Sequence, residues 1–135
     1  MDTLTAVISG LGGTPVPEAT YNFEQPPFTS PEEFLTIAQV LENTGVTAYY
    51  GAIAQVETAE LLNAGATIAT VEARHASYLN LITVEIPFPD AFDKPVAPQD
   101  VFDAASQFIE SAPEPYGPYA NAAALRALLP ATVIH

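Results

Sequence analysis

The sequence predicts an all-α protein built on one long antiparallel helical hairpin, which forms half of a four-helix bundle. Two stretches, 31–56 and 59–83, contain no proline after their first residue, and each is long enough for about seven helical turns. The segment between them is short, so the two helices are expected to fold back on each other. Prolines are frequent before and after this pair, which predicts connectors and only short helices there.

The start of each long helix is marked by particular residues. Ser30 is predicted to cap the first helix, with Pro31 at its first position and Glu33 completing a capping box. The second helix is predicted to start near Thr58, where a hydroxyl side chain again precedes an apolar stretch. Pro87 prevents this second helix from continuing.

The length of the chain and the distribution of its prolines predict one domain. A chain of 135 residues accommodates one modest hydrophobic core rather than two, so a single domain is expected over 1–135. Within it we expect a connector over 1–30 and a proline-rich segment over 84–135. Short helices are expected in the latter segment near 98–111 and 121–129.

The composition is strongly acidic, with a net charge of −13 from sixteen carboxylates against three basic side chains. Such a chain repels phosphate backbones and anionic membrane surfaces, so neither nucleic acid nor membrane is expected as a partner. It attracts divalent cations or a basic partner instead. The chain has no cysteine, which excludes disulfides, thiolate metal ligands and cysteine nucleophiles.

Charged residues are nearly absent from the interior of both predicted helices. Beyond the acidic first turns, the first helix contains only Glu42, and the second contains only Glu72 and Arg74. Both acids lie on otherwise apolar faces, where a carboxylate needs a proton, a cationic side chain or a metal. Arg74 points to roughly the opposite face from Glu72. Helices this apolar are expected to be buried on most sides in a larger assembly.

The two acids and a histidine are predicted to come together across the hairpin. If the turn is centred on Glu57, Glu42 and Glu72 are equally far from it and meet at one level. His75 follows Glu72 by three residues and shares its face. One Glu on one helix with Glu-x-x-His on its neighbour is half the ligand set of a di-iron or di-manganese bundle. Carboxylates with imidazole suit Fe, Mn or Zn.

The same residues also have a purely structural interpretation. Glu42 and Glu72 would then be protonated or water-bonded acids in the core, and His75 would be a satisfied buried histidine. Three nearby tyrosines either tune a metal site or pack in the core, namely Tyr49, Tyr50 and Tyr78. The residues alone leave both interpretations open.

Several segments resemble one family of helical proteins. The segment 41–52, LENTGVTAYYGA, resembles the third helix of ferritin-like proteins related to desiccation- and stress-induced proteins, and the segment 68–76, IATVEARHA, resembles their fourth helix. Connecting segments of the same family are similar to 11–16, 21–23, 88–95 and 107–109. The resemblance covers about residues 4–110, and its two helical motifs together are fairly specific.

The resemblance implies a ferritin-like four-helix bundle, of which this chain contains the C-terminal half. In that family the first helix pair supplies a second glutamate and a second Glu-x-x-His, and this sequence has neither. The segment 3–9 resembles the end of the second helix. Two explanations remain open: the sequence is part of a longer protein, or the hairpin dimerises to rebuild four helices. The intact connector favours the first explanation.

For function, the resemblance implies a stress-associated protein whose candidate metal ligands are Glu42, Glu72 and His75. The expected cofactor is a dinuclear Fe or Mn centre, completed by a dimer mate or by a partner that supplies the other helix pair. Such a centre would perform oxidase or peroxide-scavenging chemistry. The alternative is a non-catalytic structural or assembly protein that uses the same scaffold with an empty site. Many members of the family are exported, which makes a secreted or cell-surface location the corresponding expectation.

Overall fold

The computed structural model describes residues 2–21, 30–111 and 119–132. Contacts between residues group these parts into two compact units, which are described separately. One unit contains the described parts of Met1–Asn22 and Gln107–Leu129, and the other contains those of Phe23–Ser106 and Pro130–His135. The single domain expected over the whole chain stays a prediction.

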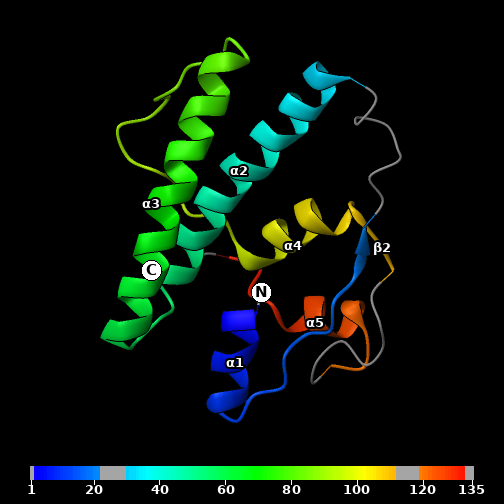
Figure 1. The fold of residues 1–135 in the computed structure, drawn as a ribbon. Helices are drawn as coiled ribbons and strands as arrows, with labels where there is room; N and C mark the ends of the chain where they lie inside the picture. Colours follow the sequence, from blue (N-terminus) through cyan, green and yellow to red (C-terminus); the bar gives the residue numbers. More distant parts are fainter. Residues whose placement is uncertain (1, 22–29, 112–118, 133–135) are drawn as a thin grey trace. The chain divides into compact units, whose positions relative to one another are not determined.

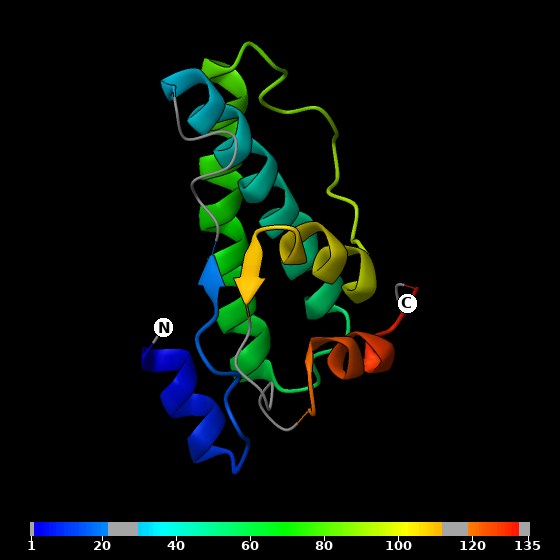
Figure 2. The ribbon, with the colours of Figure 1, turned by 90° about the vertical axis from the view of Figure 1, so that its right-hand side faces the viewer.

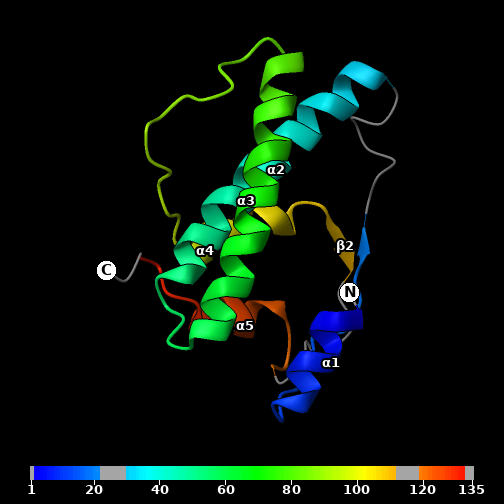
Figure 3. The ribbon, with the colours of Figure 1, turned by 60° about the vertical axis from the view of Figure 1, so that its left-hand side comes forward.

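The larger unit is built on the hairpin of helices α2, Pro31–Ile53, and α3, Ala59–Ile82. The two helices lie side by side (Figures 1, 2 and 3), which confirms the predicted hairpin. Ser30 caps α2 as expected, because its hydroxyl oxygen accepts a hydrogen bond from the backbone N–H of Glu33 at 3.2 Å. Helix α2 ends before the predicted residue 56, because the chain tightens there into 3₁₀-type bonds. The N–H of Val56 donates to the carbonyl of Ile53.

Small side chains line the contact between the two helices. Val46 on α2 and Ala69 and Ala76 on α3 are the buried apolar residues of the hairpin among the described residues. Gly65 allows Ile53 to approach closely, since a Cβ at this position would lie 3.3 Å from Cγ1 of Ile53. Elsewhere large apolar side chains remain in solvent on both helices, including Phe34, Tyr78 and Leu81. Within the described ranges, no helix combines the length and apolar character that crossing a membrane requires.

A non-helical strap, residues 83–97, leads from α3 back to α2 and can be followed in Figure 2. Helix α3 ends where Glu85 donates its N–H to the carbonyl of Asn80, a Schellman-type bond. Val84 takes the left-handed position of this turn with φ 64°, which is strained for a β-branched residue. Further along, the N–H of Val96 donates to the carbonyl of Thr47, and the carbonyl of Val96 lies directly over Gly51.

Helix α4, Pro98–Ser106, follows the strap and packs against α2. The sequence prediction of a helix as far as residue 111 is wrong at its end, because Ile109–Ser111 forms strand β2. In the smaller unit, β2 pairs antiparallel with β1, Thr20–Tyr21. Pairing with β1 satisfies backbone N–H and C=O groups of β2, so these groups do not need the hydrogen bonds of a longer α4.

The remaining elements of the smaller unit are two helices. Helix α1 spans Asp2–Gly10, and helix α5 spans Ala122–Leu128 with Asn121 as its cap. The side-chain oxygen of Asn121 accepts a hydrogen bond from the N–H of Ala124 at 2.9 Å, which confirms the predicted second short helix. Two proline-rich stretches of the sequence analysis, 22–29 and 112–118, lie outside the described residues.

Candidate metal centre

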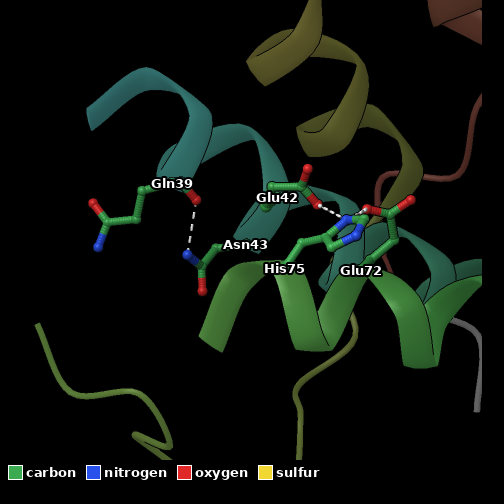
Figure 4. Close-up of polar contacts among 5 residues, drawn as sticks. All are labelled: Gln39, Glu42, Asn43, Glu72 and His75. Atoms are coloured by element: carbon green, nitrogen blue, oxygen red, sulfur yellow. Dashed lines mark hydrogen bonds and ion pairs between the residues drawn. The ribbon is translucent and has the colours of Figure 1, made fainter. Parts of the chain in front are cut away.

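The hairpin brings Glu42, Glu72 and His75 together. Glu42 extends from α2 toward Glu72 and His75 on α3 (Figure 4). Nδ1 of His75 lies 3.4 Å from Oε2 of Glu42 and 3.8 Å from Oε2 of Glu72. One ligand atom from each of the three residues lies within 4.8 Å of the others. Among the described residues, no other group of three or more histidine, aspartate or glutamate side chains is arranged to hold a metal ion.

The carboxyl groups of Glu42 and Glu72 approach each other across the hairpin, and the Glu72 carboxyl group interacts directly with that of Glu42. Glu42 also faces His75, and a Cβ at Gly45 would lie 4.0 Å from Oε2 of Glu72. The connection between the helices follows Ile53 and precedes Ala59, so it is centred on Val56, next to the predicted Glu57.

The burial of the three side chains is uneven. About a quarter of each glutamate side chain is exposed, and 55 % of the His75 side chain is exposed. Oε2 of Glu42 is nevertheless fully buried and has no hydrogen-bond partner. Among the described residues, no other buried side-chain nitrogen or oxygen atom has this property. Burying a carboxylate oxygen without a hydrogen-bond partner is costly, and its ion-pair contact with Nδ1 of His75 offsets this cost only when the imidazole is protonated. The arrangement therefore suits a proton or a cation at this atom.

Electrostatics at the centre agree with this geometry. Partial burial raises the pKa of Glu42 above its usual value of 4.5, and the neighbouring Glu72 carboxyl group raises it further. The His75 imidazole acts in the opposite direction. Without a cation, the site therefore favours a proton on Glu42. A metal ion would replace that proton, because metal binding requires deprotonated ligands.

The three tyrosines of the sequence analysis differ in their surroundings. Tyr49 lies near the centre, since burial and then the charge of Glu72 raise its pKa. Burial also raises the pKa of Tyr50, and Asp93 adds to this effect as a charge and a hydrogen-bond partner. Tyr78 has 64 % of its surface exposed, so the expectation that it packs in the core is wrong. Only Tyr49 is placed to influence the metal centre.

Sequence reasoning missed a second polar cluster beside the metal centre. The side chains of Gln39 and Asn43 on α2 hydrogen bond with Asn80 on α3. Only part of their pattern is visible in the sequence, because Gln39 and Asn43 are four residues apart and share one face of α2. Asn80 lies several residues farther from the turn than either of them, so the distance from the turn does not pair it with them.

The donor set fits a hard or borderline divalent metal. Two carboxylates and one imidazole match the ligand preferences of Fe and Mn and also of Zn. Three side chains leave at least one position of such an ion for water or for further ligands. The buried oxygen of Glu42 and the acidic chain, with its net charge of −13, both favour a cation at this position.

Comparison with known proteins agrees with the helical hairpin. Residues 1–85 match the ferritin-like domain, which is more than half of the chain and includes α2, α3 and all three candidate ligands. The chain therefore belongs to the ferritin-like domain family. No curated protein matches the sequence. The similarity expected for 88–95 and 107–109 lies outside the matched residues and stays a prediction.

Proposed function

We propose that this ferritin-like chain binds iron or manganese through Glu42, Glu72 and His75. The observation that carries the proposal is the buried Oε2 of Glu42, which has no hydrogen-bond partner and lies 3.4 Å from Nδ1 of His75. A divalent cation between these atoms would offset the desolvation of the carboxylate and the repulsion between the two acids. The resemblance to desiccation- and stress-induced proteins favours a stress-associated role.

The reaction that fits this site is oxidation of Fe(II) or removal of peroxide. A bound redox metal would supply the electrons for reduction of oxygen or peroxide. In this proposal Glu42, Glu72 and His75 would hold the metal. The exposed imidazole of His75 places one side of the centre at solvent, which gives small oxidants access.

The partner in this proposal is a second copy of the chain, which would supply a further Glu and Glu-x-x-His. Three side-chain donors are half of the ligand set of a dinuclear carboxylate centre, and a C₂ axis duplicates them. The site lies on a helix row that is open to solvent, since Val71 and Tyr78 are exposed on either side of His75. A longer chain with its own second helix pair would supply the same groups.

Metal titration of the purified chain tests the proposal. Isothermal titration with Mn(II), together with elemental analysis and light-scattering mass, should give one to two metal ions per dimer. Glu72→Ala should abolish binding, because it removes a ligand. Glu57→Ala is the matched control, since it removes the same charge from an exposed position between the helices and should leave binding intact.

Two results would contradict the proposal in different ways. Protein that binds neither Mn(II) nor Fe(II) would leave a non-catalytic scaffold whose Glu42 is kept neutral by a proton. Binding that persists in Glu72→Ala and is lost in Glu57→Ala would place the metal elsewhere. A monomer that binds one ion tightly would keep the metal site and remove the dimer from the proposal.

A further inference from the structure

We infer that Gln39, Asn43 and Asn80 form an amide lock that positions Glu42 against Glu72 and His75 and thereby sets metal affinity. This inference rests on the metal binding proposed above. None of the three amides is a candidate metal ligand, so their role is to hold the helices that carry the ligands.

The lock is a closed set of hydrogen bonds between α2 and α3. Oδ1 of Asn80 accepts one bond from Nε2 of Gln39 at 3.0 Å and another from Nδ2 of Asn43 at 2.9 Å. The same Nδ2 group of Asn43 also donates to the backbone carbonyl of Gln39 at 2.8 Å, a bond drawn in Figure 4. Both N–H groups of the Asn43 amide are therefore used, one on each helix.

Burial makes these bonds directional constraints. Asn80 is only 5 % exposed and is the one polar residue among the described buried residues. Rotating or sliding α3 against α2 would leave its amide without partners in a poorly hydrated position, which is costly. The apolar residues Val46 and Ala76 line the same pocket as Asn80, and apolar contacts carry little directional information.

The position of the lock relates it to the metal centre. Asn43 directly follows Glu42, and Asn80 lies on α3 beyond His75. The connection between Ile53 and Ala59 joins the helices on the other side of the ligands. The metal centre is therefore held between a covalent connection at one end and the amide lock at the other. Without the lock, α2 and α3 would be free to move relative to each other on that side of the metal centre, which would change the distance between Glu42 and His75.

This arrangement resembles a general device of helical assemblies. A single buried polar residue in an apolar helix interface fixes register at a cost in stability. Replacing all members of such a cluster with apolar residues of similar size is then neutral or stabilising, while the unique alignment is lost. A purely stabilising cluster would behave in the opposite way.

The experiment compares two lock variants with a matched control. Asn80→Leu removes the shared acceptor, and the triple variant Gln39→Leu/Asn43→Leu/Asn80→Leu removes all three polar groups together. Asn63→Leu makes the same substitution at an exposed position of α3. For each protein we would measure the Kd for Mn(II), the urea midpoint without metal, and the distance distribution between spin labels. The labels would be attached through Phe34→Cys and Leu81→Cys, at exposed positions in a chain that has no other cysteine.

We expect the triple variant to keep its urea midpoint, to bind Mn(II) about 10- to 100-fold more weakly, and to show a broader label distance distribution. Asn63→Leu should match the parent protein in all three measurements. A folded triple variant with unchanged Kd and unchanged distances would overturn the inference. If the parent protein binds no Mn(II), the proposed function fails. The label distances then still test the lock, because a distribution that stays narrow in both lock variants overturns it and a broader one supports its positioning role.

Discussion

Helices α2 and α3 enclose two polar clusters that differ in what completes them. In the amide lock, Asn80 is buried and bonds to both Gln39 and Asn43. In the metal centre, Glu42 and Glu72 are both acceptors when ionised. Oε2 of Glu42 has no hydrogen-bond partner, and its neighbour is Nδ1 of His75 at 3.4 Å. The two clusters are neighbours along the same pair of helices, so the difference between them lies in side-chain chemistry.

Amides carry donors and acceptors together, so three of them close into a satisfied set. Ionised carboxylates only accept hydrogen bonds. The ion-pair partner of Glu42 and Glu72 is His75, and the chain contains only three lysine and arginine residues. A satisfied buried cluster fixes structure, whereas an unsatisfied one requires a proton or a metal from solution. This difference supports the proposed positioning role of the lock and the proposed metal-binding role of the carboxylates.

The largest effect is expected on metal affinity when the histidine is removed. His75→Ala should weaken Mn(II) binding by at least about 100-fold, because loss of a direct ligand exceeds the 10- to 100-fold cost of losing a supporting group. Its metal-free stability should change by less than about 0.5 kcal/mol, since 55 % of the side chain is exposed. Titration calorimetry and urea unfolding measure the two effects separately. A large loss of stability without metal would show that His75 has a structural role and would remove the contrast between the clusters.

The next largest effect is expected from two glycines on α2 that respond in opposite directions. Gly51→Ala should destabilise the chain by about 1–3 kcal/mol, because the new Cβ would collide with the backbone carbonyl of Val96 in the strap. Gly45→Ala should stabilise it by about 0.5–1 kcal/mol through helix propensity, since its Cβ would make only ordinary contact with Glu72 at 4.0 Å. Thermal unfolding of both variants tests the pair. Equal effects would mean that the strap does not restrain this face of α2.

A smaller effect concerns the pH dependence of the metal-free protein. The pKa of Glu42 is raised by burial and by Glu72, so the folded state binds this proton more tightly than the unfolded state. The stability contributed by Glu42 is complete below pH 4.5 and is lost as the pH rises through the raised pKa. Glu42→Gln should therefore be neutral or stabilising at about pH 7, by up to about 1 kcal/mol, and should lose this advantage in acid.

Urea unfolding with a chelator at both pH values measures this difference, with Glu57→Gln as the control for total charge. A Glu42→Gln variant that is less stable than its parent at both pH values would show that the carboxylate already has a stabilising partner within the protein. Metal-bound wild-type protein should show the reverse trend, because acid protonates the ligands and releases the ion.

The smallest effect is expected at the ion pair between Lys94 and Asp90 in the strap. Its nitrogen and oxygen atoms lie 2.9 Å apart, but both side chains are exposed. Lys94→Ala should change stability by less than about 0.5 kcal/mol, and thermal unfolding at low and high salt would measure it. A larger loss of stability would mean that this exposed ion pair stabilises the strap as strongly as a buried contact does.

The sequence predicted the hairpin because its signals are local. Ser30 and Pro31 mark the first helix, and two long apolar stretches joined by a short turn leave few other arrangements. The Glu-x-x-His spacing placed Glu72 and His75 on one face, and their approach to Glu42 followed from the antiparallel turn. Each of these steps uses residues within one helix or across one short connection.

The features that were missed depend on contacts distant in sequence. Ile109 continues the apolar helical spacing of the preceding residues, yet residues 109–111 pair with Thr20 and Tyr21, which no local signal indicates. The exposure of Tyr78 depends on whether another chain or segment covers α3. To predict the amide lock, one must know to within one helical turn which residues of α2 and α3 face each other. The position of the turn can be predicted from the sequence only approximately.

The short connection between α2 and α3 also affects how the protein folds. All three candidate ligands and all three amides lie within one hairpin, between residues 39 and 80, so the site is formed by contacts close in sequence. Contacts of this kind form early and fast. The hairpin is complete once α3 has been synthesised, before α4 and α5 follow. A metal ion that binds then would add its binding free energy to hairpin formation and would act as a template for folding.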